Sequence, residues 1–228
     1  TNNFATWNPL AISGTTANVF TEGNLKSANG IAFGGIPTIG LGDSGKWYAE
    51  FLATSTGTDR CVGLQSNLTT AFGNYNPGRY AGSYSYDDDG QKYETNSGSS
   101  YGATYTTGDI IGVAADLTNN KLYFSKNDTW QDSGVPTSGA TGTGAISISS
   151  TPADGYFFGV GDRTNNATWY ANFGSDSSFA GEKTAQGNQD DNGKGDFYYA
   201  PPSGFLALCT DNLSTPEIAL PGENFNTV

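Results

Sequence analysis

A continuous apolar stretch followed by an alternating one stands at the centre of the chain. Residues 110–115 read IIGVAA, which is typical of a strand buried on both faces. The polar run DLTNN that follows contains asparagines, which tolerate the positive φ of a turn. Beyond it, Leu122 and Phe124 occupy alternate positions, as in a strand with one buried face. Residues 108–130 are therefore predicted to form a β-hairpin in the middle of a sandwich.

Other short segments alternate in the same way. In GKWYAEF, Trp47, Ala49 and Phe51 share one face of a predicted strand. Tyr84 and Tyr86 also stand at alternate positions, ahead of the turn DDDG. Further strands are predicted at 60–65, 146–148, 156–161, 168–173 and 204–209, and loops at 97–102 and 136–144. Short strands separated by glycine-rich turns, without helical periodicity, predict an all-β sandwich.

Composition supports one large domain without a second core. The chain has 228 residues, 32 of them glycine, and 13% of its residues are aromatic, which suits turns and pleated surfaces. We expect an N-terminal arm with edge strands over 1–40, the sandwich core over 41–210, and a C-terminal linker or tail over 211–228. The formal net charge of −12 disfavours nucleic acid and anionic membrane surfaces as partners. No apolar run is long enough to insert into a membrane.

The residue types exclude several kinds of catalysis. The sequence contains no histidine, so Ser-His-Asp and Cys-His arrangements cannot form. The two cysteines, Cys61 and Cys209, are predicted to be buried free thiols, although a disulfide between neighbouring strands stays open. Paired carboxylates could serve a polysaccharide-acting enzyme, and Glu50 and Asp116 are the candidates for that alternative. The expectation is nevertheless a protein without catalytic residues.

Two patterns could bind ligands. Oxygen-bearing side chains alternate ahead of a glycine in NQDDNG, as in the first half of a calcium loop, with the candidate ligands Asn188, Asp190, Asn192 and Asp196. The position of the usual bidentate Glu is occupied by Tyr199, so a plain polar turn is the other interpretation. Aromatic residues in glycine-rich loops form a candidate recognition surface, comprising Tyr75, Tyr80, Tyr101, Tyr105 and Trp130. Packing of these rings against the sandwich is the alternative.

Five segments, in order, resemble the SPRY domain family. They are GKWYAEF, YSYDDDGQK, GDIIGV continuing to LYFSKN, the pair YFFGV and NFG, and PSGF, which together extend over roughly residues 40–210. The resemblance implies a bent, concanavalin-like sandwich of two antiparallel sheets. It also implies binding through variable loops, usually of protein partners, and no catalysis.

The ends NNFATWNPL and PPSGFLALCTDNL are more similar to SPRY modules in structural proteins of marine tailed bacteriophages. That resemblance implies an extracellular, virion-associated module of a tail or capsid. Its loops would contact a host-surface glycan or protein, neighbouring virion proteins, or further copies of itself. A purely architectural subunit of a filament or shell is an alternative. The sequence lacks methionine and shows no leader, so we expect a processed product or part of a larger protein.

Overall fold

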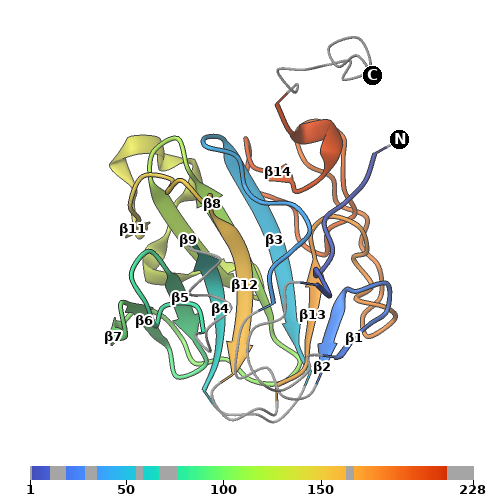
Figure 1. Cartoon of the computed structure of the whole chain (residues 1–228), viewed down its shortest axis with the longest axis horizontal. Coiled ribbons are helices and arrows are strands. Elements are labelled where there is room, and N and C mark those ends of the chain that lie inside the picture. The colour runs from blue at the N-terminus through green and yellow to red at the C-terminus, as the bar shows by residue number, and fades with distance from the viewer. Residues whose placement is uncertain are drawn as a thin grey trace, which may run out of the picture.

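The computed structural model describes residues 2–10, 19–28, 35–54, 59–66, 76–162 and 167–214. They form two β-sheets packed face to face, so the predicted all-β sandwich is confirmed (Figure 1). The larger sheet has the order β1 (Val19–Thr21), β2 (Lys26–Ala28), β13 (Trp169–Asn172), β3 (Lys46–Ala53), β8 (Ile110–Asp116), β9 (Lys121–Lys126) and β10 (Thr129–Trp130). Two short strands extend it: β11 (Ile146–Ser147) pairs with β9, and β14 (Leu206–Ala207) pairs in parallel with β3. All other strand pairs within the described ranges are antiparallel.

The smaller sheet has the order β12 (Phe157–Asp162), β4 (Arg60–Gln65), β5 (Tyr84–Asp87), β6 (Gln91–Glu94) and β7 (Ser97–Ser100). Helical structure in the described ranges is limited to the 3-10 turns η1 (Gln131–Ser133), η2 (Pro136–Thr141) and η3 (Thr210–Asn212). None of these turns could cross a membrane. The 136–144 segment, predicted as a loop, thus contains a 3-10 turn.

The predicted central hairpin is confirmed as β8 and β9. Val113 of β8 faces Phe124 of β9, and every residue of β8 is buried. Both faces are buried because Ile111 and Val113 belong to the core between the sheets, whereas Ile110 and Ala114 belong to clusters on the other face of the large sheet. The residues of β3 that point inward, Trp47, Ala49 and Phe51, belong to the core between the sheets.

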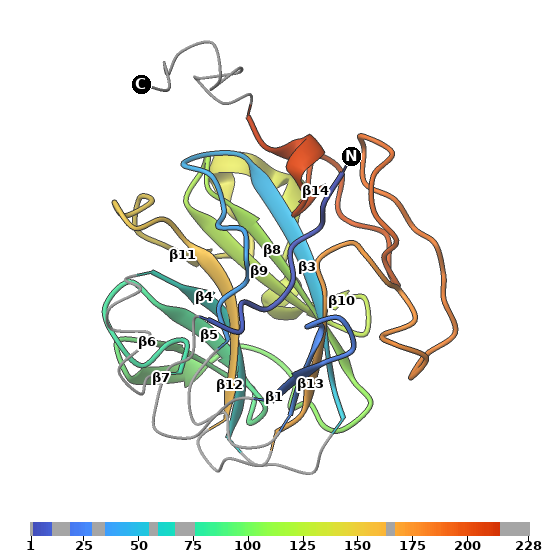
Figure 2. The same cartoon turned by 45° about the vertical axis from the view of Figure 1, so that its right-hand side comes forward.

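The outer face of the large sheet is covered by the segment 174–205, which carries few regular elements (Figure 2). Tyr48 on the outer side of β3 packs with Phe197 and Phe205. Leu52, two positions further along, packs with Phe179. This irregular layer is the reason that an antiparallel strand such as β3 is buried on both of its faces.

Two local expectations have different outcomes. Cys61 and Cys209 are free and buried, as predicted. The predicted loop at 97–102 is wrong in its first part, because Ser97–Ser100 form β7. Thr95 and Asn96 have positive φ values of 50° and 59°, which is the conformation of a two-residue type I′ hairpin turn. This turn aligns the polar sequence SGSS with β6 despite the low strand preference of serine and glycine.

Candidate functional site

The predicted aromatic surface is largely part of the core. Tyr80, Tyr101 and Tyr105 are buried, so the expectation of exposed rings is wrong for these three. Tyr101 and Tyr105 belong to the core between the sheets, whereas Tyr80 packs with Ile36 in a separate small cluster. Trp130 is half-buried at the end of β10, and Tyr75 lies outside the described residues.

The hydroxyl groups of these rings have structural partners. The Tyr105 hydroxyl donates to the carbonyls of Arg60 at 3.0 Å and Tyr86 at 3.1 Å. The Tyr101 hydroxyl accepts from the backbone amide of Phe124 at 3.3 Å. Burial raises the pKa of the Tyr105 hydroxyl well above its ordinary value. These tyrosines therefore connect loops to strands.

The predicted calcium loop is held by hydrogen bonds to Asp190. Its Oδ1 accepts from the backbone amides of Asn192 at 2.9 Å and Lys194 at 2.8 Å. Its Oδ2 accepts from the Ala207 amide at 2.9 Å and from Asn212 Nδ2 at 2.8 Å. Four N–H donors thus occupy the carboxylate and tie the loop to β14.

The other candidate calcium ligands include Asn192, whose Nδ2 donates to Asn212 Oδ1 at 2.9 Å. Asn188 donates through Nδ2 to the carbonyls of Phe197 and Tyr198, so this amide secures the loop. Asp196 is half-buried and its Oδ1 lacks a hydrogen-bond partner. Within the described ranges, no three His, Cys, Asp or Glu side chains are placed to hold a metal ion. The hydrogen bonds of Asn188 and Asp190 are those of a polar turn, and calcium binding by NQDDNG stays a prediction.

The two carboxylates of the enzyme alternative are buried and lie apart. Glu50 accepts from the amides of Tyr198 and Tyr199, from Asn172 Nδ2 and from the Tyr48 hydroxyl. In the register of β3 and β8, Asp116 faces Lys46, four positions from the level of Glu50. That spacing corresponds to roughly 13 Å along a strand, beyond the separations of about 5–10 Å that glycosidases use.

A groove opens where the two sheets diverge at the β6–β7 edge. The inner face of the small sheet carries core residues on β5, where Tyr84 and Tyr86 pack inside. The same face continues onto β6 with Lys92, opposite Tyr86, and Glu94, opposite Tyr84. Charged residues at core-facing positions indicate that the large sheet no longer covers this edge.

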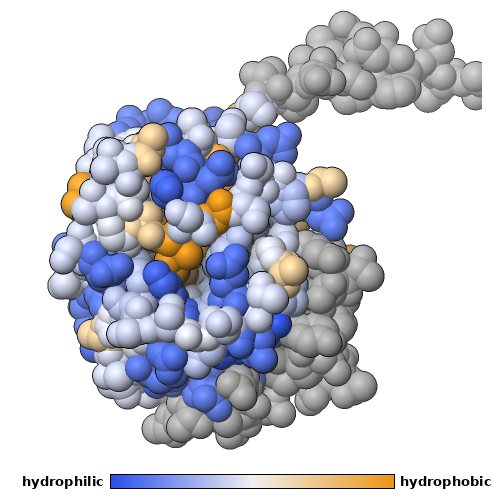
Figure 3. Space-filling model, turned by 90° about the vertical axis from the view of Figure 1, so that its left-hand side faces the viewer, coloured by the Kyte–Doolittle hydropathy of each residue, from blue (hydrophilic) through white to orange (hydrophobic). Residues whose placement is uncertain are grey.

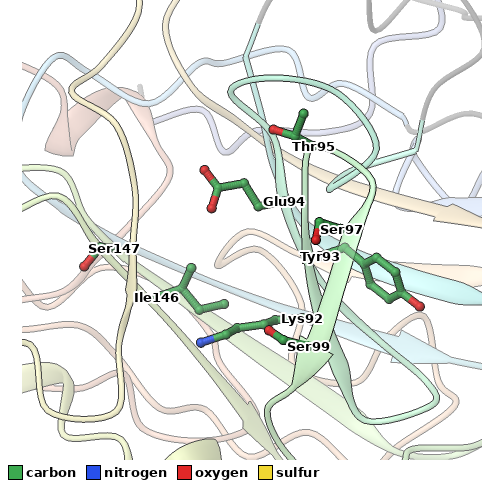
Figure 4. Close-up of a pocket in the computed structure, with 8 residues that line it drawn as sticks. All are labelled: Lys92, Tyr93, Glu94, Thr95, Ser97, Ser99, Ile146 and Ser147. Atoms are coloured by element: carbon green, nitrogen blue, oxygen red, sulfur yellow. The ribbon is translucent and has the colours of Figure 1, made fainter.

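This hairpin groove has a volume of about 460 Å³ and is lined by Lys92, Tyr93, Glu94, Thr95, Ser97, Ser99, Ile146 and Ser147. Figure 3 looks onto this side and shows apolar side chains at the centre of a hollow with a polar rim. In Figure 4, Lys92 and Glu94 extend from β6 toward Ile146, whereas the Tyr93 ring points away. Ile146 belongs to the core and is 7% exposed, so it contributes a small apolar wall opposite a charged and hydroxyl-bearing one.

Charges of both signs lie around the groove. Glu94 is exposed, whereas Lys92 is half-buried with its Nζ 5.4 Å from the centre of the Tyr101 ring. On the opposite wall, Lys121 Nζ donates to Ser147 Oγ at 3.1 Å. The exposed carboxylate of Glu94 is thus the charge at the rim that faces solvent most fully.

The hairpin is supported from behind by Arg79. Its guanidinium group lies 3.6 Å from the centre of the Tyr93 ring and forms an ion pair with Asp87. Burial raises the pKa of Asp87 to about 7, an effect that Arg79 opposes. The Tyr93 ring also covers Gly98, where a Cβ would lie 2.6 Å from the ring. This packing fixes the orientation of Lys92 and Glu94 on the other face.

The hairpin groove was not among the sites predicted from the sequence. Its signal is the alternation of Lys92 and Glu94 with apolar Tyr93, followed by a two-residue turn and a strand without large side chains. Such an edge is polar on its inner face, so it cannot continue the core.

Residues 46–149 match the family model of the SPRY domain. The dual specificity protein kinase splA of Dictyostelium discoideum is 35% identical over 85 residues, which are 37% of this chain and 3% of that protein. Human Ran-binding protein 9 is 36% identical over 85 residues, 36% of this chain and 12% of that protein. The chain thus spans a small part of the length of these curated relatives.

Solved structures agree in fold. A human SPRY domain has a TM-score of 0.51 at 19% identity, covering 70% of this chain and 96% of that one. The SPRY domain of human HERC1 has a TM-score of 0.54 at 16% identity, with coverage of 72% and 96%. At these sequence identities, the two comparisons show that the fold is similar and nothing more.

Proposed function

This chain contains a SPRY domain, and we propose that it is a non-catalytic protein-interaction module that binds a partner protein in the hairpin groove. The observation that carries the proposal is the groove itself. It combines a volume of about 460 Å³ with an apolar wall at Ile146 and a polar wall on β6 and β7. Protein-binding sites typically combine an apolar centre with a polar rim in this way.

The absence of catalysis is part of the proposal. Glu50 and Asp116 are fully buried, and each carboxylate already accepts several hydrogen bonds. The groove presents hydroxyl groups, one lysine and one glutamate, and the chain contains no histidine to activate a hydroxyl nucleophile. An association through side-chain contacts is the activity that these groups support best.

A virion location, with host-surface or neighbouring virion proteins as partners, remains the finer proposal from the sequence. The relatives reported above are eukaryotic proteins and do not bear on it. Immunogold labelling of purified virus particles with an antibody to this chain would test the location. Labelling of the tail or capsid is expected, and its absence from particles would contradict the proposal.

Selection of peptides tests the groove. We expect a random peptide library to yield ligands for the full chain whose affinity falls at least about tenfold in Ser99→Arg, because the long side chain fills the groove. Thr129→Arg is the matched control, since it places the same side chain at an exposed strand position of β10. Equal affinities for both variants would show that the ligands bind elsewhere.

A further inference from the structure

We propose that the partner binds by adding a β-strand to the open edge of β7, as an extended peptide of net positive charge. This inference rests on the proposed function, because β7 forms one wall of the hairpin groove. β7 is the last strand of the small sheet and pairs only with β6 among the described residues (Figure 1).

The hairpin turn determines which backbone groups face outward. In a two-residue hairpin the pair beside the turn is hydrogen-bonded, and such pairs alternate along the ladder. Glu94 with Ser97 and Lys92 with Ser99 are therefore the hydrogen-bonded pairs. The N–H and C=O groups of Gly98 and Ser100 consequently point away from β6, toward the open edge.

β7 is short, with four residues, but it lacks three other features that usually protect an exposed edge. Natural edge strands carry charged residues, proline or a bulge that prevents pairing with another chain. The sequence of β7 is Ser-Gly-Ser-Ser, all four residues are exposed, and the register with β6 is continuous without a bulge. An added strand would therefore meet little steric or electrostatic opposition.

The proposed occupant follows from the surroundings of the edge. Alternate side chains of a strand beside β7 would point into the hairpin groove, where Ile146 favours an aliphatic side chain. The exposed Glu94 and the net charge of −12 favour basic residues in the remainder of the peptide. Backbone hydrogen bonds would supply affinity, and the groove would supply selectivity.

The test uses the full chain and the peptides selected as described above. Ser100→Pro removes the outward N–H while leaving the β6–β7 hydrogen bonds intact, and Ser100→Ala keeps that N–H. We expect the proline variant to bind about tenfold more weakly and the alanine variant to bind within about twofold of wild type. Thermal melts of both variants report whether the fold is retained.

Hydrogen exchange of the wild-type protein provides a reading that needs no variant. On saturation with peptide, the amides of Gly98 and Ser100 should exchange at least about tenfold more slowly, whereas those of Ser97 and Ser99 should change little. If the peptides bind more weakly to Ser99→Arg but do not slow exchange of the Gly98 and Ser100 amides, strand addition is overturned. Binding in the hairpin groove would then still be supported. A library that yields no groove-dependent peptide would overturn both proposals.

Discussion

Glu50 and Tyr199 are 149 positions apart, yet Oε1 of Glu50 accepts a hydrogen bond from the backbone amide of Tyr199 at 2.7 Å. The other oxygen, Oε2, accepts from the amide of Tyr198 at 2.8 Å. One buried carboxylate on the central strand β3 thus holds the irregular layer that covers the sheet. This arrangement satisfies backbone donors that would otherwise be buried without acceptors.

Removing that carboxylate should destabilise the domain. Glu50→Ala leaves the Tyr198 and Tyr199 amides without their acceptor, and we expect a loss of about 3 kcal/mol in the free energy of unfolding. Urea denaturation at pH 5 measures it, and the exposed Glu94→Ala should change the value by less than about 0.5 kcal/mol. Equal effects of the two substitutions would contradict the role of Glu50.

The stability contributed by Glu50 should depend on pH. Burial raises its pKa from 4.5 to about 7, with the four hydrogen bonds opposing the shift. The folded state therefore binds a proton that the unfolded state releases between these values, so stability falls as the pH rises through this window. We expect wild type to lose up to about 3 kcal/mol relative to Glu50→Gln between pH 4.5 and pH 7. A relative gain with rising pH would contradict the raised pKa.

The buried Tyr105 hydroxyl should matter for stability and not for binding. Tyr105→Phe removes the donor to the carbonyls of Arg60 and Tyr86, and we expect a loss of about 1–2 kcal/mol. Tyr93→Phe is the control, since its hydroxyl makes an exposed contact with Asp89 at 3.4 Å. The affinity of Tyr105→Phe for the selected peptides should stay within about twofold of wild type. A larger loss would indicate that the Tyr105 side chain takes part in binding.

The Asp190 loop should keep its stability without calcium. Because four N–H groups occupy the carboxylate, we expect addition of EDTA to leave the melting temperature unchanged. Asp190→Ala should instead lower the free energy of unfolding by about 2–3 kcal/mol, as four donors lose their acceptor. A melting temperature that falls with EDTA and recovers with added calcium would restore the calcium prediction.

The rim charge should control the rate of association. Glu94→Lys is expected to slow binding of the basic peptides several-fold at low salt and to reduce the dependence of the rate on ionic strength. Stopped-flow fluorescence measures both quantities. Glu22→Lys makes the same change in net charge at an exposed position beside β1 and should have the smaller effect. Equal slowing by both variants would assign the effect to the net charge alone.

The central strands could be predicted because their side chains record which faces are buried. The apolar run of β8 and the alternation of Trp47, Ala49 and Phe51 reflect local periodicity, and both predictions are confirmed. The hydrogen bonds from the Tyr198 and Tyr199 amides to Glu50 could not be predicted in this way. They join segments distant in sequence and leave no local pattern.

The candidate site was harder to predict for a related reason. A tyrosine in a glycine-rich loop has the same sequence pattern whether its ring is exposed or turned into the core. Tyr101 and Tyr105 are buried because their rings pack against Tyr86 in the core between the sheets. The hairpin groove depends on how far two sheets diverge, which is a property of their packing and not of any single strand.

The position of β13 has a consequence for synthesis of the chain. β2 and β3 follow one another in sequence, but the place between them belongs to β13, residues Trp169–Asn172. Until these residues have emerged from the ribosome, the nascent chain therefore has two unpaired strand edges in its main sheet. The main sheet is completed only when Trp169–Asn172 become available, and until then its two open edges can pair with the wrong neighbour.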